Sequence, residues 1–301
     1  MKIAVILTCF NRKAKTIKCL DSLSTALNQY NNTHCNKIIT DIFLTDDGCT
    51  DGTPDAVRES IKGINVYIVQ GDGNLYWAGG MRAAWNAALK SRGYDYYLLI
   101  NDDTFIYNNA ITTLFETEKY CLDTYKRKGI YSGITCAPDN KLTITYGGDV
   151  WINRAKAISK RLGPSDKPQL CDMTNANILL VPNEVVGEIG IFYDGYQHGI
   201  ADYDYSIQAR DHGIPVLITA DICGECDNDH ASKEEIRKKI CSMSFRERVK
   251  YFKSPLHSNK DYLTFIKRST PNRYWMVYVG RMLNSYFPKF YYWLEDHLRR
   301  P

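Results

Sequence analysis

The sequence predicts an α/β protein in which a mostly parallel, mixed sheet is flanked by helices and followed by a helical appendage. β-rich apolar runs alternate with runs of helical apolar spacing through the first half of the 301 residues. This alternation is typical of βαβ units, which build parallel sheets. Polar clusters follow the predicted strands, and charge and aromatic content change near residue 231. These observations together indicate a ligand-binding sheet with an added tail.

Four strands and four helices are expected in the first half. The strands are predicted at 2–10, 38–47, 64–71 and 94–103, and the helices at 14–30, 54–61, 80–91 and 109–126. Further strands are expected at 131–138, 141–151 and 176–182. The polar stretch 153–169 is interpreted as a mobile loop. Ligands of such sheets bind at the carboxyl ends of the strands, where the polar clusters fall.

The composition is that of a globular protein, with 44% hydrophobic and 24% charged residues. No apolar run approaches the roughly 20 residues needed to span a bilayer. The N-terminal run MKIAVILTCFNR is not followed by a small-residue cleavage site, so we interpret it as a strand and expect a cytoplasmic protein. The ten cysteines are scattered, and we expect reduced thiols.

The tail, residues 232–301, is basic and aromatic. It holds 16 Lys and Arg against 6 Asp and Glu, a net charge of +10 in a chain whose total is +4. Amphipathic helices are expected at 244–253 and 262–268, followed by an aromatic run at 274–294. Such a surface suits contact with anionic lipid at the inner membrane face. A helical cap packed on the body is the alternative interpretation.

The fourth strand runs into Asn101, Asp102 and Asp103. Two adjacent carboxylates repel each other and are costly to bury unless a cation lies beside them. A solvated turn is the simplest explanation of this pair taken alone. Asn11 with Arg12, and Asp46 with Asp47, are the polar residues that end the first two strands.

The second strand ends in TDDGCTDGT. Gly48 relaxes the turn, Asp51 and Thr53 can cap the next helix, and Asp46 or Asp47 can accept a hydrogen bond from a pyrimidine N3–H or a ribose hydroxyl. The run resembles the D-D-G-S-x-D-x-T signature of nucleotide-sugar-dependent glycosyltransferases of family 2. A capped turn without a ligand remains the alternative.

GNLYWAGGMRAAWNAAL resembles the next block of the same family. Glycines let the backbone approach a nucleotide, and a helix N-terminus favours a diphosphate. The residues expected at the nucleotide are Asn11, Asn74, Trp77, Gly79, Gly80 and Arg82, with Arg82 paired to the diphosphate. An Ala-rich core helix explains the end of the block but not its Trp-Ala-Gly-Gly start.

The resemblance also gives the acidic pair a role. The family's fourth strand ends in an Asp-x-Asp motif that holds Mn²⁺ or Mg²⁺ against the donor diphosphate, and Asn101-Asp102-Asp103 matches it with Asn first. It implies that Asp103 ligates the metal, that Asn101 contacts the ribose or a metal-bound water, and that Asp102 is part of the donor-binding site. Hard oxygen ligands suit such an ion.

HGIADYDYSIQARDHG resembles the region that supplies the family's base. The match implies that Asp202 takes the proton from the acceptor hydroxyl and that Asp204 orients the segment. Ala201 stands where an acid is usual, and Gln208 where an Arg is common. His230 falls where many relatives place a His, which implies a metal ligand, and a solvated loop His is the alternative.

The resemblance covers residues 1–231 and implies the fold called GT-A, with a nucleotide-binding half at 1–105 and an acceptor half at 106–231. It implies a metal-dependent inverting glycosyltransferase that moves one sugar from a UDP- or dTDP-sugar to a saccharide or lipid-linked acceptor, in cell-surface polysaccharide synthesis, without nucleic acid. No Q-x-x-R-W block of processive relatives is present.

Three other functions stay open. A sugar-nucleotide pyrophosphorylase needs a Gly-rich basic loop after the first strand, which TCFNRKAK lacks. A zinc-dependent nucleic-acid-binding protein would use Cys223, Cys226, His230 and the basic tail. A catalytically inert, sugar-binding relative is the third, although Asp103 and Asp202 are both present.

Overall fold

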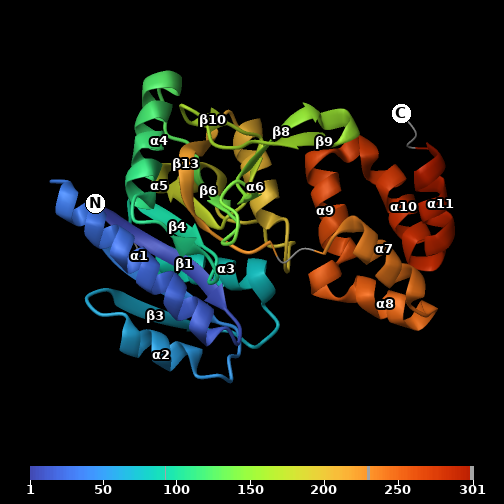
Figure 1. Cartoon of the computed structure of the whole chain (residues 1–301), viewed down its shortest axis with the longest axis horizontal. Coiled ribbons are helices and arrows are strands. Elements are labelled where there is room, and N and C mark those ends of the chain that lie inside the picture. Colours follow the sequence, from blue (N-terminus) through green and yellow to red (C-terminus); the bar gives the residue numbers. More distant parts are fainter. Residues whose placement is uncertain (92, 229–230, 299–301) are drawn as a thin grey trace.

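The computed structural model describes residues 1–91, 93–228 and 231–298, which form an α/β body joined to a bundle of helices (Figure 1). These residues contain a ten-stranded mixed sheet and a separate three-stranded sheet. The main path of the large sheet runs, in spatial order, through β10 (Gln169–Leu170), β13 (Val216–Glu225), β6 (Ile130–Cys136), β12 (Ile178–Pro182), β4 (Tyr96–Ile100), β1 (Lys2–Cys9), β2 (Ile39–Asp46) and β3 (Asn65–Gln70). Beside this path, β5 (Phe105–Ile106) pairs with β13, and β7 (Ile144–Tyr146) pairs with β6. The predicted α/β fold is confirmed.

The first half of the chain builds the parallel part of the sheet. β1 pairs in parallel with β2 and β4, and β2 pairs in parallel with β3. β12 then runs antiparallel between β4 and β6, so the sheet becomes mixed where the second half joins it. All five residues of β4 are buried, as expected for a strand covered on both faces.

Helices cover both faces, and β1 shows how the side chains divide between them. Val5 and Leu7 pack in one core with α1, α2 and α4, whereas Ala4 and Ile6 pack in the other with α3, α5 and α6. This alternation follows from the two-residue period of a strand. The helices of the body are α1 (Lys13–Thr33), α2 (Thr53–Ser60), α3 (Tyr76–Ser91), α4 (Ala110–Tyr125), α5 (Asn183–Ile189) and α6 (Ala201–Asp211).

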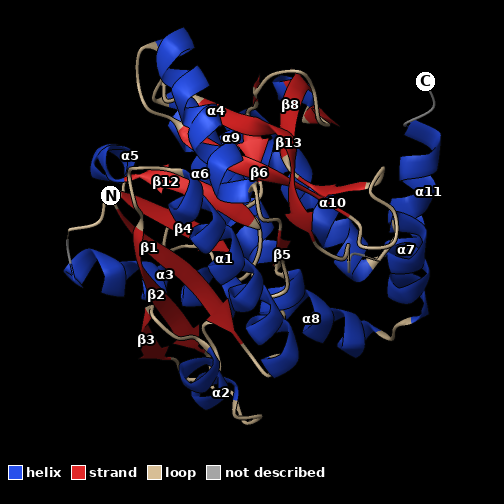
Figure 2. Cartoon of the chain, turned by 60° about the vertical axis from the view of Figure 1, so that its left-hand side comes forward, coloured by secondary structure: helices blue, strands red, loops and turns tan. Residues whose placement is uncertain are grey.

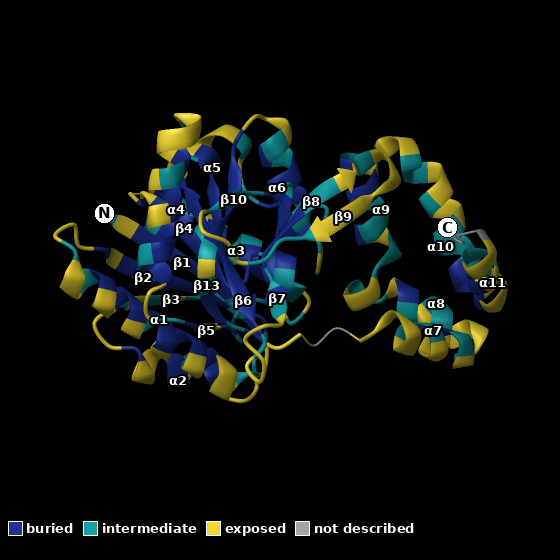
Figure 3. Ribbon diagram, turned by 45° about the horizontal axis from the view of Figure 1, so that its top comes forward, coloured by how far each residue is buried: buried dark blue, intermediate teal, exposed yellow. Residues whose placement is uncertain are grey.

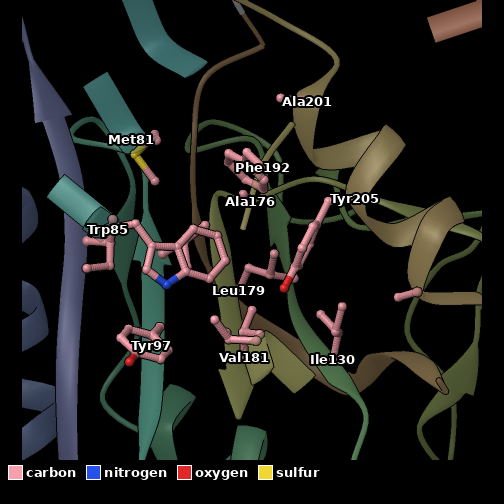
Figure 4. Packing of buried hydrophobic residues seen from close by; sticks show 14 of the residues in the cluster. Met81, Trp85, Tyr97, Ile130, Ala176, Leu179, Val181, Phe192, Ala201 and Tyr205 are labelled. Carbon is pink, nitrogen blue, oxygen red and sulfur yellow. The ribbon is translucent and has the colours of Figure 1, made fainter. Parts of the chain in front are cut away.

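Aromatic side chains fill the second core. Trp85 of α3 is fully buried and lies 5.8 Å from Tyr97, 5.4 Å from Phe192 and 5.7 Å from Tyr205, measured between ring centroids (Figure 4). These tilted and edge-to-face arrangements are the ones that aromatic pairs prefer. Because Tyr205 belongs to α6, this cluster fixes the helix that starts beside Asp202 against α3.

One expectation about the middle of the chain is wrong. The stretch predicted as a mobile loop contains β9 (Ile158–Arg161) and a short 3₁₀ helix, and β9 pairs with β8 (Gly148–Asn153), which also pairs with β11 (Met173–Thr174). Arg154 anchors it, donating to both carboxylate oxygens of Asp211 at 2.6 Å and to the Ser269 carbonyl at 3.1 Å. The polar composition of this stretch did not indicate a hairpin, because the residues that anchor it, Asp211 and Ser269, are distant in sequence.

The tail is helical, as predicted (Figure 2). Its helices are α7 (Lys233–Ser242), α8 (Phe245–Lys253), α9 (Asn259–Ser269), α10 (Tyr274–Tyr286) and α11 (Pro288–Leu298). Capping boxes at Ser232 and Ser244 begin α7 and α8. The aromatic run breaks before Pro288, which has no N–H and is tolerated in the first turn of a helix. Among the described residues, none belongs to a helix both long and apolar enough to cross a membrane.

The tail is partly fused to the body. Phe265 and Ile266 of α9 are buried in the second core of the body, whereas Ile240, Phe252 and Tyr292 form a small core within the tail. Figure 3 shows the contrast between the buried interior of the body and the many exposed residues of the tail. α9 is therefore an integral part of the body's core, and the other tail helices extend from it.

Candidate active site

Polar residues gather at one edge of the sheet because β1, β2 and β4 are parallel. The register places Cys9 opposite Asp46 and Ile6 opposite Leu99, so the three strands end together. The residues that follow them are Asn11 and Arg12 after β1, Asp47 after β2, and Asn101, Asp102 and Asp103 after β4. The predicted gathering of these residues at the carboxyl ends of the strands is what the pairing produces.

Arg12 binds both carboxylates of the acidic pair. Its Nη1 donates to Asp102 Oδ1 at 3.0 Å, and its Nη2 donates to Asp103 Oδ2. Thr16 Oγ1 also donates to Asp102 Oδ2 at 3.2 Å. The side chains of Asp102 and Asp103 are 7% and 14% exposed, whereas that of Arg12 is 37% exposed. A cation does lie beside the pair, and the chain itself supplies it.

The carboxyl of Asp102 has a raised pKa. Burial raises the pKa of Asp102 to about 6, against the opposing effect of Arg12, and the negative charge of Asp103 raises it further. The hydrogen bond from Thr16, like the charge of Arg12, lowers the pKa of Asp102. Asp102 is therefore a buried carboxylate whose charged form depends on neighbouring cations.

The donor set fits a small divalent ion. Two adjacent carboxylates on the edge of the sheet supply hard oxygen ligands, and a Mg²⁺- or Mn²⁺-type ion commonly takes one or two carboxylates together with substrate phosphates. The guanidinium of Arg12 stands at these oxygens as a stand-in cation. Within 1–91, 93–228 and 231–298, no group of three or more His, Cys, Asp or Glu forms a metal cluster. Asp102 and Asp103 would hold the ion with the donor's oxygens.

The carboxylates of Asp46 and Asp47 accept hydrogen bonds from different parts of the chain. Asp46 accepts from the Cys49 N–H at 2.7 Å and from Gln70 Nε2 at 2.9 Å. Burial acts to raise the pKa of Asp46, but these hydrogen bonds outweigh it and hold the pKa below its usual value. Asp47 accepts the backbone N–H groups of Gly73, Leu75 and Tyr76 at 2.9–3.2 Å. Asp47 thus shapes the loop before α3.

Asn11 and Asn74 both stabilise loops at this edge. Asn11, with a positive φ of 51°, accepts from the Thr50 N–H at 2.7 Å and joins the first loop to the second. The side chain of Asn74 donates to the Asp72 carbonyl at 3.3 Å, and the backbone carbonyl of Asn74 accepts from Gln197 Nε2 at 3.2 Å. These contacts order the loops in which a nucleotide would lie.

The start of α3 connects to the acidic edge through Trp77. Its Nε1 donates to Asn101 Oδ1 at 2.8 Å. A Cβ at Gly80 would meet Thr8 Oγ1 at 2.2 Å, so this glycine lets α3 approach β1, and a Cβ at Gly79 would meet Leu75 at 3.3 Å. Arg82 donates to the carbonyls of Tyr193 and Tyr196, at 3.2 and 2.7 Å. Close helix packing is thus a sufficient reason for Gly80.

Asp202 lies at the start of α6 and is 8% exposed. Its Oδ2 accepts from the Ala176 N–H at 3.1 Å, and its Oδ1 accepts from the Tyr203 N–H at 2.9 Å. Burial raises its pKa to about 6, although these hydrogen bonds and one from Asn175 oppose the shift. Asp202 makes no ion pair with any described residue. A carboxylate with this pKa can take a proton near neutral pH.

A single segment links Asp202 to the acidic edge. The Ala176 N–H donates to Asp202, and the adjacent Asn177 carbonyl accepts from the Asn101 N–H at 3.3 Å. Asn177 Nδ2 also donates to Cys226 Sγ at 3.4 Å, and Cys226 Sγ donates to Asp103 Oδ1 at 3.7 Å. The predicted base and the predicted metal ligands are therefore parts of one site.

The tail holds the segment around Asp202 at two points. Arg268 Nε of α9 donates to both oxygens of Asp204, at 2.9 and 3.0 Å, and the Asp204 side chain is 2% exposed. Asp261 Oδ2 of α9 accepts the N–H groups of Gln197 and His198 at 3.0 and 3.1 Å. Asp204 was predicted to orient this segment. Arg268 was not predicted, because its partner Asp204 is 64 residues away in the chain.

The other residues considered as metal ligands are His230, Cys223 and Cys226. His230 lies outside the described residues. Cys223 donates to Thr219 Oγ1 at 3.5 Å, whereas Cys226 contacts Asp103 and Asn177, so the two thiols of the C-x-x-C pair serve different neighbours. All ten cysteines are free thiols in the structure, as expected.

Known proteins resemble this chain in sequence over its first part and in fold over nearly all of it. Residues 4–119 match the family model described as Glycosyl transferase family 2. A search of curated proteins found no match. The mannosyltransferase PcManGT from Pyrobaculum calidifontis, solved with GDP-Man and Mn²⁺, superposes with a TM-score of 0.53 at 14% identity, covering 95% of this chain and 81% of that one.

TarS of S. aureus is a second structural neighbour. Residues 1–349 of TarS with UDP-GlcNAc give a TM-score of 0.53 at 12% identity, again covering 95% of this chain and 81% of that one. At this identity the likeness shows the shared fold, and the family model matches the part of the chain from residue 4 to residue 119. The chain therefore has the GT-A fold of solved glycosyltransferases, and its residues 4–119 match the model of glycosyl transferase family 2.

Proposed function

We propose that this enzyme is a metal-dependent, inverting glycosyltransferase that adds one sugar from a UDP- or dTDP-sugar to a hydroxyl of a saccharide or lipid-linked acceptor in cell-surface polysaccharide synthesis. The observation that carries the proposal is the segment 175–177, which joins the buried carboxylate of Asp202 to the Asp102–Asp103 pair. A base and a cation site held by one segment are what a single displacement requires.

In the proposed reaction, Asp202 accepts the proton of the acceptor hydroxyl. The oxygen attacks the anomeric carbon on the side opposite the leaving nucleoside diphosphate, so the configuration inverts. Positive charge from a Mn²⁺ or Mg²⁺ ion, if bound here, would stabilise the leaving group. Asp102 and Asp103 would hold this ion, and Asp46, Asn11 and the loop shaped by Asp47 lie where the nucleoside would bind.

Two solved neighbours support a nucleotide-sugar donor. PcManGT was solved with GDP-Man and Mn²⁺, and TarS with UDP-GlcNAc and with UDP. Our proposal of a pyrimidine nucleotide rests on the carboxylates at the end of β2, which can accept from a pyrimidine N3–H. Thermal shift with a panel of nucleoside diphosphates, each with and without Mn²⁺, tests this choice directly.

We also propose that the enzyme contacts the inner membrane face through its tail. Large apolar side chains on α10, on α11 and at the residue between them are strongly exposed: Trp275 at 73%, Trp293 at 51% and Phe287 at 64%. The tail that bears them has a net charge of +10. Exposed aromatic residues beside positive charge suit the headgroup layer of anionic lipid.

The decisive experiment compares the wild type with Asp103→Ala. Calorimetry should show Mn²⁺-dependent binding of the preferred nucleoside diphosphate that the substitution removes, with the melting temperature nearly unchanged. NMR of the product should show the inverted anomer. Unchanged Mn²⁺-dependent affinity in Asp103→Ala would overturn the metal assignment, and a retained anomer would overturn the single displacement.

A further inference from the structure

An open groove of about 820 Å³ lies between the start of α6 and the tail helices. One end of the groove is formed by His198, Gly199 and Ile200. Ile200 is two residues before Asp202 and has a positive φ of 69°, which turns the chain into α6. The groove thus begins beside the catalytic carboxylate and continues into the tail, away from the strand ends where the donor binds.

The floor of the groove is a stripe along α10. Residues 276, 277, 279, 280, 281, 283 and 284 of α10 line it, together with Arg273, which immediately precedes the helix. Val277 and Leu283 make this stripe apolar, and Gly280 leaves it open, since its nearest heavy atom outside the helix is Tyr291 Cε2, 3.6 Å from where a Cβ would be.

The mouth of the groove opens onto the exposed apolar surface of the tail. Met276 and Val279 line the groove and are 60% and 53% exposed. They are neighbours of Trp275, the most exposed aromatic residue of α10. The groove therefore connects the exposed apolar surface of the tail with the start of α6, and apolar side chains of α10 line part of it.

The charge of the groove favours an anion. Lys233, Arg273 and Arg281 line it, against the carboxylates of Asp261 and Glu295. Asp261 already accepts the N–H groups of Gln197 and His198. Nε and Nη1 of Arg273 are buried and have no hydrogen-bond partner among the described residues. A desolvated guanidinium with unsatisfied donors is costly unless an anion approaches it.

We infer that this groove binds the apolar chain and the anionic linkage of a lipid-linked acceptor, and so delivers the acceptor's hydroxyl to Asp202. The inference rests on the proposed function and names the acceptor class. The apolar stripe of α10 takes the chain, Arg273 attracts a phosphate-type linkage, and the saccharide extends past Ile200. A donor nucleotide-sugar has no apolar chain and binds at the other end of the site.

The test uses the full-length protein and dodecyl phosphate, held below its micelle concentration, as the probe in calorimetry. Dodecyl glucoside tests the need for the anion, and inorganic phosphate tests the need for the chain. Gly280→Trp fills the groove, with Gly280→Ala as its matched control. Arg273→Gln removes the charge, with Arg246→Gln, on the exposed side of α8, as its control. Thermal unfolding verifies that each variant is folded.

We expect dodecyl phosphate to bind the wild type more tightly than either comparison ligand. Binding should be lost in Gly280→Trp and weakened about tenfold in Arg273→Gln, since a hydrogen bond to a charged group is lost, while both controls bind as the wild type does. Wild-type affinity in both groove variants, or no binding to the wild type, would overturn the inference. Binding of nucleoside diphosphate with Mn²⁺, measured on the same samples, reports the proposed function separately, because the groove variants leave the strand ends unchanged.

Discussion

At the scale of single residues, Arg12 and the acidic pair act as one system of charges. Arg12 neutralises two carboxylates that would otherwise repel each other in a largely buried position. A divalent ion bound to Asp102 and Asp103 must share or take over the oxygens that the guanidinium now contacts. In the proposed metal site, Arg12 and the ion would therefore compete for the same oxygens, and the released guanidinium would be available to a diphosphate.

Replacing Arg12 by Gln should consequently strengthen Mn²⁺ binding by the free protein, by about tenfold, since charge-assisted hydrogen bonds to both carboxylates no longer oppose the ion. Calorimetry at pH 8, where Asp102 is ionised, measures the effect. Arg58→Gln, which removes an exposed ion pair with Asp55, is the matched control and should leave Mn²⁺ affinity unchanged. Weaker Mn²⁺ binding in Arg12→Gln would mean that Arg12 orients the carboxylates and does not compete for them.

Asp202 is the second residue whose environment sets its chemistry. Its pKa is raised to about 6 by burial, so the base is mostly ionised at pH 7 and becomes protonated below pH 6. We expect kcat at saturating substrates to fall about tenfold between the plateau and pH 5, because only the ionised form accepts a proton. Asp202→Asn should lower kcat by about 10²-fold or more and abolish this dependence.

Measuring the affinity for the nucleotide distinguishes a catalytic role of Asp202 from a structural one. Asp202→Asn should bind the nucleoside diphosphate with Mn²⁺ as tightly as the wild type, because the proposed role of Asp202 is toward the acceptor and not toward the donor. If donor affinity falls as much as turnover does, Asp202 has a structural or nucleotide-binding role and the assignment of the base is wrong.

At the scale of elements, α9 is the tail helix that contacts the segment around Asp202. It buries Phe265 and Ile266 in the body, pairs Arg268 with Asp204, and accepts the N–H groups of 197 and 198 through Asp261. The segment 197–204, which contains Asp202, is therefore held at both ends by one helix. We infer that α9 positions the base, so the tail cannot be removed after residue 231 without exposing the body's core.

Arg268→Met should test this positioning role. It leaves the Asp204 carboxylate buried without its cation, which is expected to cost about 3 kcal/mol of unfolding free energy. We expect a lower kcat with little change in nucleotide affinity. The exposed neighbour Lys267→Met is the matched control on the same helix. The double variant Asp204→Asn with Arg268→Met should recover stability and part of kcat, and failure of this rescue would argue against the pair.

At the scale of the whole molecule, the body and the tail have opposite charge and different surfaces. The body encloses two apolar cores, whereas the tail presents exposed aromatic residues on α10 and α11. Contiguous exposed apolar surface of this kind is uncommon on proteins without a partner. The body and tail are joined through α9, so a membrane-bound tail would hold the active site near the lipid.

Substituting Trp275, Phe287 and Trp293 together by Ser should remove binding to vesicles that contain anionic lipid, measured by co-sedimentation at low salt. Each Lys or Arg that reaches the surface contributes roughly 1 kcal/mol, and high salt should weaken the initial attraction. Leu142→Ser, at an exposed apolar residue of the body, is the control. Wild-type protein that ignores these vesicles at low salt would leave the exposed face as a contact with protein.

Local sequence was sufficient for much of the fold. Strand and helix periods predicted the alternating first half, because apolar spacing is a local property, although β4 pairs with the distant strands β1 and β12. α3 nevertheless begins at Tyr76, four residues before the predicted start, since the backbone N–H groups before it bind Asp47. The hairpin of β8 and β9 was missed because its polar residues are ordered by distant partners such as Asp211 and Ser269.

The sequence by itself determined the order of the motifs, the acidic edge of the sheet and the basic, aromatic character of the tail, because strand ends, turn residues and net charge are local properties. Only the tertiary structure decided that Arg12 contacts both carboxylates, that segment 175–177 links them to Asp202, and that Arg268 of α9 holds Asp204. These contacts join residues that are tens of positions apart, and one-dimensional spacing contains no information about which charges burial will bring together.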